Sequence, residues 1–146
     1  MSGIDALAVL AGLIAVATAA GLVWRARSGR VRSSASGLRI VPSDVGAASF
    51  GPEVTLLQFS TAFCSPCRST ARVLHDVAAT RPGAEHVDVD LTDRPDLARR
   101  YNVLQTPTTF ILDGSGLVRA RIGGAVRLAD VRSALTEITG SIHASS

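Results

Sequence analysis

The sequence of 146 residues predicts an α/β fold, in which a central mixed β-sheet is flanked by helices and preceded by one N-terminal transmembrane helix. Ala6–Trp24 runs for 19 residues without a charge, close to the ~20 that a helix needs to cross a bilayer. Farther along the chain, apolar runs of strand length alternate with segments of helical periodicity. The last two strands are separated by only a short Gly-containing turn, which predicts an antiparallel hairpin beside parallel strands.

Residues 1–24 are expected to form a membrane anchor. Trp24 ends the apolar span, where an aromatic side chain favours the bilayer interface. Two alternatives compete with the anchor: a cleaved signal peptide, because Ala17-Thr18-Ala19 resembles a cleavage site, and a buried core helix. The start "MSGID" lacks the basic residue of a signal peptide, and the span has no polar face, so the anchor is preferred.

Residues 25–37, "RARSGRVRSSASG", are expected to form a flexible basic tether that faces lipid headgroups. Four arginines follow the apolar span and none precedes it, so the positive-inside rule places the C-terminal part in the cytoplasm. The net charge is +3, but residues 40–146 carry 10 arginines against 11 acidic residues. Because the excess positive charge belongs to this short flank, nucleic-acid binding is not expected.

Residues 38–140 are expected to form the folded domain, and residues 141–146 a disordered C-terminal tail. Val54–Ser60 is a continuous apolar run, typical of a strand that is covered on both faces. Apolar positions recur at helical spacing from Cys67 to Thr80. The other expected elements are a weak strand at Leu38–Val41, a strand at His86–Asp90, a helix from Asp93 to Asn102, a hairpin of Pro107–Asp113 with Leu117–Ile122, and an amphipathic helix from Arg127 to Thr139. This order predicts a mixed sheet with helices on both faces.

The stretch "FCSPCR" contains the only two cysteines, Cys64 and Cys67. A structural zinc site needs four ligands, and neither His75 nor His86 completes a paired spacing, so no metal is expected. A structural disulfide is also disfavoured, because a loop of two residues removes little entropy from the unfolded chain and the expected compartment is reducing.

A redox-active pair explains the position of the cysteines better. Cys64 enters a predicted helix, where unpaired backbone N–H groups and the helix dipole stabilise a thiolate. The thiolate attacks disulfides, so Cys64 is the expected nucleophile, and Cys67, one turn later, is placed to resolve the mixed disulfide. Pro66 between them is expected to tune the potential. No metal or organic cofactor is needed.

A second motif, "QTPT", places Pro107 at the entry of a predicted strand, where an ordinary trans proline would also be tolerated. Together, "FSTAFCSPCR", "YNVLQTPTTFILDGSG" and "IGG" resemble thioredoxin over about residues 40–140. The resemblance implies a thioredoxin-like fold in which Pro107 is cis and adjacent to the disulfide. It also implies that the backbone of Thr106 pairs with the substrate peptide, and that Gly123 leaves room beside the active site.

Two positions depart from the family pattern. Phe63 stands in place of the tryptophan before the first cysteine, and Gln58 in place of the buried acid that helps to deprotonate the resolving cysteine. The lysine often paired with that acid is also missing, and its place falls on His86 or Asp88. Since an amide cannot accept a proton at neutral pH, resolution by Cys67 is expected to be slow.

These expectations combine into a membrane-tethered thiol:disulfide oxidoreductase that faces the cytoplasm and reduces protein disulfides. Its expected partners are disulfide-containing proteins, the lipid bilayer, and a dithiol electron donor such as a thioredoxin reductase or a membrane thiol carrier. Two alternatives stay open. One is an extracytoplasmic exchange protein that serves cytochrome maturation or exported proteins, and the other is a thioredoxin-shaped binding module without turnover.

Overall fold

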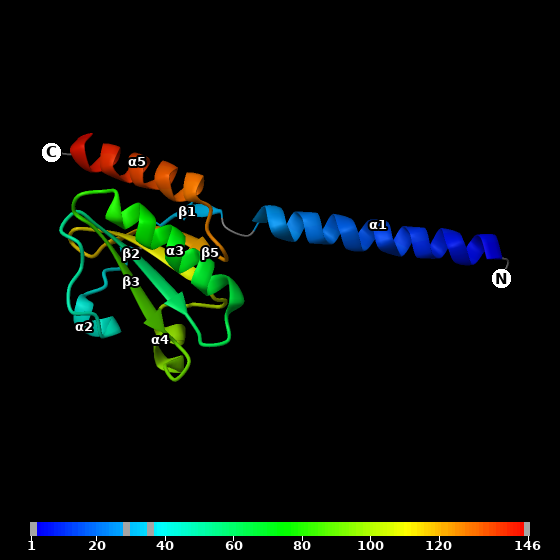
Figure 1. Ribbon diagram of the computed structural model, residues 1–146, viewed down its shortest axis with the longest axis horizontal. Helices are drawn as coiled ribbons and strands as arrows, with labels where there is room; N and C mark the ends of the chain where they lie inside the picture. The colour runs from blue at the N-terminus through cyan, green and yellow to red at the C-terminus, as the bar shows by residue number, and fades with distance from the viewer. Residues whose placement is uncertain (1–2, 28–29, 35–36, 145–146) are drawn as a thin grey trace.

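A computed structural model describes residues 3–27, 30–34 and 37–144 (Figure 1). A long helix leads into a domain in which strands and helices alternate before a final hairpin and helix. The elements are α1 (Gly3–Arg27), β1 (Val31–Ser33), α2 (Pro42–Val45), β2 (Val54–Ser60), α3 (Ser65–Ala79), β3 (Ala84–Asp90), α4 (Pro95–Arg100), β4 (Thr108–Asp113), β5 (Val118–Gly123) and α5 (Leu128–Ala144).

The expected mixed sheet is confirmed, with the strand order β1-β5-β4-β2-β3. β2 and β3 are parallel and connected through α3, whereas β4 runs antiparallel to both β2 and β5. All seven residues of β2 are buried, as its continuous apolar run predicted. Because Phe59 pairs with Thr108, the C-terminal end of β2 and the entry of β4 meet at one end of the sheet.

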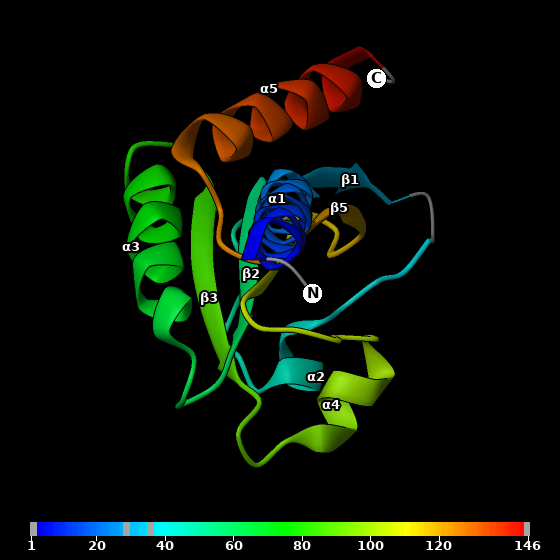
Figure 2. The ribbon, with the colours of Figure 1, turned by 90° about the vertical axis from the view of Figure 1, so that its right-hand side faces the viewer.

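Helices cover both faces of the sheet, as expected (Figure 2). On one face, Leu74 of α3 and Leu135 of α5 pack against Leu56 of β2 in a single apolar cluster. On the other face, α2 and α4 cover a second cluster that contains Phe59 and Phe110. The two clusters fix the helices on the sheet. They therefore also fix the ends of the loops that connect helices and strands.

Two boundaries differ from the sequence-based expectation at the edge of the domain. The segment expected to be a tether contains a strand, because Val31–Ser33 adds to the sheet edge and Val31 pairs with Ile122. The strand expected at Leu38–Val41 is instead a single bridge between Arg39 and Leu117. Residues 28–29 and 35–36 of the expected tether lie outside the described residues.

The last helix is longer than expected. Gly140 was expected to end it, yet α5 continues to Ala144, so the expected disordered tail is wrong for residues 141–144. A glycine within a helix lowers its stability by only about 1 kcal/mol relative to alanine. Ile138, just before Gly140, still packs in the core and holds this part of the helix on the domain. Residues 145 and 146 lie outside the described residues.

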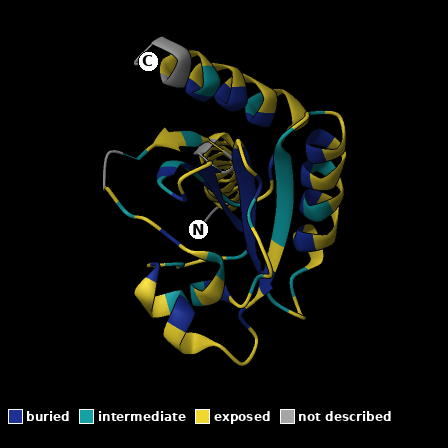
Figure 3. Cartoon of the chain, turned by 90° about the vertical axis from the view of Figure 1, so that its left-hand side faces the viewer, coloured by how far each residue is buried: buried dark blue, intermediate teal, exposed yellow. Residues whose placement is uncertain are grey.

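α1 is the one helix in the described part of the chain that is long and apolar enough to cross a membrane. Its apolar span is not buried in the domain, and the part of the helix visible in Figure 3 is coloured as exposed. The alternative of a buried core helix is therefore wrong. A membrane anchor and a signal sequence both remain consistent with this helix.

Candidate active site

Cys64 and Cys67 form a disulfide with a Cα–Cα distance of 5.4 Å. Cys64 is the N-cap residue of α3, and Cys67 lies in its first turn, where the Cys67 amide donates to the Cys64 carbonyl at 3.2 Å. Cys64 is partly exposed, whereas Cys67 is only 5% exposed. An incoming disulfide therefore reaches Cys64 first, and Cys67 lies behind it.

The local sequence explains why the helix begins at this point. Cys64 has an extended backbone conformation that cannot continue a helix, and Pro66 occupies the first turn, where its missing N–H has no intrahelical partner to lose. No side chain caps this helix end. The positive end of the helix dipole thus lies next to the sulfur atoms, as predicted, and favours a thiolate at Cys64 in the reduced state.

The loop before β4 lies against the segment before the cysteines. The Thr106–Pro107 peptide bond is cis, which confirms this part of the expectation. The hydroxyl oxygens of Thr61 and Thr106 are 3.3 Å apart, which joins the two loops. The Thr108 hydroxyl also donates to the Gln105 carbonyl at 2.7 Å and closes the turn around the proline.

Two glycines border this loop, and sequence analysis singled out only one of them. Gly123 pairs with Thr108, and a Cβ there would meet Nε2 of Gln105 at 2.7 Å. Gly124 has a φ of 89° and donates its amide to the Pro107 carbonyl at 2.8 Å. A side chain strains that conformation, so Gly124 also supports the proline loop. The second glycine of "IGG" was the available signal.

Gln58, which stands where the family has an acid, is completely buried below the cysteines. Its Nε2 donates to the Cys67 carbonyl at 3.0 Å, and its Oε1 lies 3.2 Å from Nε2 of His86. Because the amide nitrogen is used on Cys67, Oε1 must accept, and His86 donates from Nε2. Burial lowers the pKa of His86, although nearby Asp88 acts to raise it, so the ring is held in its neutral form.

Large apolar side chains are exposed on both sides of the site. Phe63, directly before the nucleophile, is 94% exposed, and Leu104, three residues before the cis proline, is 84% exposed. Neither contributes to the core, so both are available to contact a substrate. The exposure of Leu104 cannot be predicted from the sequence, because the pattern of a short loop does not indicate whether its leucine is buried.

Metal binding has no candidate site in the part of the chain that the structure describes. No group of three or more His, Cys, Asp or Glu side chains is close enough together there to hold an ion. His75 is exposed on α3, and His86 is already hydrogen-bonded to Gln58.

Comparison with known proteins agrees with this geometry. The sequence profile of the family described as Thioredoxin matches residues 49–137. The rice protein "Thioredoxin H-type" (Oryza sativa subsp. indica) is 31% identical over 93 residues, which cover 64% of this chain and 75% of the relative. "Thioredoxin H2" of Arabidopsis thaliana is 33% identical over 73 residues, which cover 50% of this chain but only about half, 54%, of the relative.

A solved structure gives the same result for the fold. The X-ray structure of thioredoxin from Fasciola hepatica matches with a TM-score of 0.51 and 25% identity, and the match covers 60% of this chain and 82% of that one. The matched family region contains both cysteines and the cis proline and excludes α1 and β1. This chain therefore belongs to the thioredoxin family of thiol-disulfide oxidoreductases.

Proposed function

We propose that this protein is a membrane-tethered thiol:disulfide oxidoreductase that reduces disulfides in other proteins, with Cys64 as nucleophile and Cys67 as resolving residue. The observation that carries the proposal is the asymmetry of the pair. Cys64 is partly exposed at the start of α3, while Cys67 is buried one turn behind it. Only one of the two sulfurs can be attacked or can attack from outside.

The reaction transfers two electrons from the cysteine pair to the substrate. The Cys64 thiolate attacks one sulfur of the substrate disulfide, forms a mixed disulfide and releases the other substrate sulfur as a thiolate. Cys67, after losing its proton, attacks Sγ of Cys64 and releases the second substrate thiolate. The Cys64–Cys67 disulfide that results is the form seen in the structure. A dithiol donor, such as a thioredoxin reductase or a membrane thiol carrier, returns the two electrons.

Thr106 and Pro107 are the proposed substrate-binding residues. The cis bond belongs to a loop that Thr61 and Gly124 hold against the cysteine end of the sheet. An extended peptide that pairs with the backbone of Thr106 would bring its disulfide to Cys64. Such pairing uses main-chain groups and therefore accepts many sequences.

α1 is the proposed anchor, and the arginines that follow it favour a cytoplasmic location of the domain. Within this proposal, residues 1–24 are the anchor and the folded domain extends to α5. The domain also includes β1, because its strand pairs with β5. The reducing compartment on that side suits a protein that must be returned to its dithiol form.

The direct test is reduction of insulin by the full chain in detergent micelles, with a small dithiol as electron donor. The wild type is expected to precipitate the insulin B chain rapidly, and Cys64→Ser to act no faster than the donor alone. Cys67→Ser is expected to stop after one turnover as a mixed disulfide, detectable by mass spectrometry. Equal rates for the wild type and Cys64→Ser would support the binding module, for which the loss of the buried acid at Gln58 is the one favourable observation.

The extracytoplasmic alternative is tested by labelling intact cells with a membrane-impermeant thiol reagent after mild reduction. Protection of Cys64 until the membrane is permeabilised is expected for a cytoplasmic domain. Labelling in intact cells would place the domain outside and reverse the proposed orientation.

A further inference from the structure

Two arginines face each other across the edge of the sheet. Arg32 of β1 and Arg121 of β5 are Cα partners in the antiparallel register, so their side chains leave the same face of the sheet. Like charges directly opposite in a strand pair are destabilising. The ion pairs found between described residues involve Arg94, Arg100 and Arg119. Neither Arg32 nor Arg121 takes part in any of them.

Arg121 is held in place without losing its charge. Its guanidinium donates to the backbone carbonyls of Tyr101 and Asn102 and lies 5.0 Å from the centre of the Phe110 ring. Burial, followed by the nearby charge of Arg32, lowers the pKa of Arg121. Neutral carbonyls orient a cation but do not cancel its repulsion from a second cation. An anion bound between the two guanidinium groups would offset this repulsion.

The two arginines line a groove of about 480 Å³ that continues to the cis-proline loop. Leu104, Gln105 and Thr108 form the part of its wall that precedes and follows Pro107. Among the described residues, those that line the groove include a third arginine, Arg30, and none that is acidic. Arg30 also borders a second groove with Asp130 and Glu137, so Arg32 and Arg121 are the two arginines that are expected to hold an anion.

We propose that this groove binds a carboxylate side chain of the protein substrate, so that the protein prefers disulfides whose flanking residues are acidic. This inference rests on the proposed function. A peptide paired with Thr106 continues along the loop wall toward Arg32 and Arg121, and an Asp or Glu on that side meets both guanidinium groups. β1 lies outside the matched family region, so half of the arginine pair comes from outside the part of the chain that the family profile covers.

A lipid headgroup is the other anion within reach, because β1 follows α1 closely. The shape of the site favours the peptide. Arg121 is half-buried against Phe110 and the carbonyls at the end of α4, in a groove that shares its wall with the substrate loop. An extended chain can enter such a groove, whereas headgroups in a flat membrane surface would first meet the exposed arginines nearer to α1, Arg25 and Arg30.

The test uses the reduced full chain in phosphatidylcholine nanodiscs and two peptides that differ only beside their cysteine. Each peptide carries the cysteine as a mixed disulfide with thionitrobenzoate, whose release is followed by absorbance, and is flanked by either three Glu or three Gln. We expect the second-order rate constant for thionitrobenzoate release in a single turnover to be about fivefold higher for the Glu peptide at low salt and the preference to vanish near 0.5 M salt. Arg32→Gln is expected to remove most of the preference, and Arg32→Glu to reverse it toward a Lys-flanked peptide.

Arg132→Gln is the matched control, because it removes one exposed arginine from α5, away from the groove. It should keep the preference, which separates a local site from the net charge of the protein. Equal rates for both peptides, or equal losses in Arg32→Gln and Arg132→Gln, would overturn the proposal while leaving the reductase function intact. A third outcome would also overturn the proposal. If the peptide preference is absent in phosphatidylcholine nanodiscs and the protein binds phosphatidylserine vesicles in an Arg32-dependent way, the groove binds lipid.

A readout without turnover distinguishes failure of this proposal from failure of the proposed function. Fluorescence anisotropy measures the affinity of the oxidised chain for the same two peptides with Ser in place of Cys. Tighter binding of the Glu peptide, again lost in Arg32→Gln, supports the groove even if no peptide disulfide is reduced. Equal affinities with normal reduction would refute the groove alone.

Discussion

Gln58 stands where the family has a buried acid, and it forms a hydrogen bond that an ionised acid could not form. A carboxylate at this position would accept a proton, but the amide donates to the Cys67 carbonyl and accepts from His86. It therefore fixes the first turn of α3 on β2 without offering a base to the resolving thiol. The proposed reaction is left with solvent or the leaving thiolate as the proton acceptor for Cys67.

Replacement of Gln58 by Asp should restore that base. We expect the second step, release of product from a Cys64 mixed disulfide, to become about 100-fold faster at pH 7, at the lower end of general-base effects. Single-turnover stopped-flow measurement on the isolated mixed disulfide resolves this step. Gln58→Asn, which shortens the side chain without adding a base, is the matched control. An unchanged rate in the Asp variant would show that Cys67 does not need an internal proton acceptor.

His86 should make the stability of the domain depend on pH. Burial lowers its pKa below the ordinary 6.5, against a raising effect of Asp88 and with a smaller lowering effect of His75. As the pH falls below 6.5, the unfolded chain binds the proton first, so the folded state loses stability until the folded pKa is passed. Urea unfolding of the full chain in micelles, followed by circular dichroism from pH 7.5 to 5, should show this decline.

The His86→Gln variant removes the titrating group and should flatten the dependence over the same pH range. His75→Gln removes only a lesser neighbouring charge and should keep most of the decline. A slope that is identical in the wild type and His86→Gln would mean that another group titrates, and would contradict the hydrogen-bonded neutral ring described here.

At the scale of single residues, the sequence indicated the two cysteines and the proline of the proposed site better than the residues that hold them in place. Cys64, Cys67 and Pro107 are recognisable because their spacing and residue types leave few alternatives. The place of the family's lysine was assigned only to His86 or Asp88, because the sequence does not show where a short insertion lies, and the hydrogen bond between His86 and Gln58 was not predicted. The link between Thr61 and Thr106 joins loops 45 residues apart and leaves no trace in either loop sequence.

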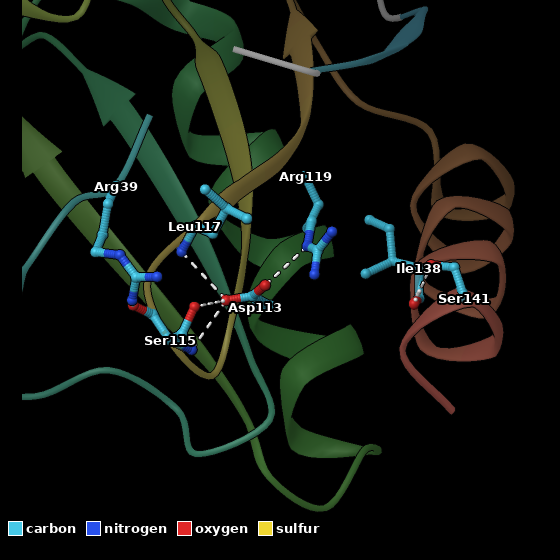
Figure 4. A network of polar contacts seen from close by, with 7 residues as sticks. All are labelled: Arg39, Asp113, Ser115, Leu117, Arg119, Ile138 and Ser141. Carbon is cyan, nitrogen blue, oxygen red and sulfur yellow. Dashed lines mark hydrogen bonds and ion pairs between the residues drawn. The ribbon is translucent and has the colours of Figure 1, made fainter. Parts of the chain in front are cut away.

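The turn of the β4–β5 hairpin lies far from the redox site and is held together by the side chain of Asp113. Oδ1 of Asp113 accepts from the Ser115 amide, the Ser115 hydroxyl and the Leu117 amide, and Oδ2 accepts from Nε of Arg119 at 2.7 Å (Figure 4). Burial acts to raise the pKa of Asp113, but the hydrogen bonds from Ser115, Arg119 and Leu117 outweigh it and lower the pKa. The carboxylate thus organises the whole turn.

Asp113→Asn should destabilise the domain by about 1–2 kcal/mol at pH 7, because it removes the charge from a hydrogen-bonded pair that is partly buried. The wild-type advantage is present above pH 3.8, the ordinary pKa, and is lost as the pH falls through the lower folded value. Urea unfolding at pH 7 and at progressively lower pH measures both effects. Disulfide reduction at pH 7 should be unchanged, since Asp113 pairs with Val54 at the opposite end of β2 from Cys64.

Among the elements, the buried strands and the amphipathic helices were predictable, and the edge was not. β2 and the two strands of the β4–β5 hairpin are apolar or alternating runs of strand length bounded by turn residues, which favour a sheet. β1 is three residues long and carries Arg32 in a segment rich in serine, so its composition resembles a linker. Its pairing with β5 depends on an open sheet edge, which is a property of the assembled domain and not of Val31–Ser33 itself.

The position of β1 also decides how the domain meets its anchor. Val31 pairs with Ile122, next to Gly123 and the cis-proline loop, so the chain enters the sheet at the redox end. Figure 1 accordingly shows the start of α3 on the side of the domain that faces α1, and Figure 2 looks at that side along α1. If α1 is a membrane anchor, as we propose, Cys64 faces the bilayer surface across a short connection. Disulfides close to the membrane are then its accessible substrates.

This arrangement predicts that the length of the connection controls substrate choice. Insertion of 15 Gly/Ser residues between Ser28 and Gly29 lets the redox end turn away from the bilayer, since such a linker is a flexible coil. In nanodiscs, the insertion should raise the rate of insulin reduction several-fold while lowering the rate for a disulfide peptide anchored to the same disc by a lipid chain. In detergent micelles without a bilayer surface, both forms should reduce insulin equally. Equal insulin rates in nanodiscs would show that the wild-type connection does not hold the redox end against the membrane, whatever α1 does.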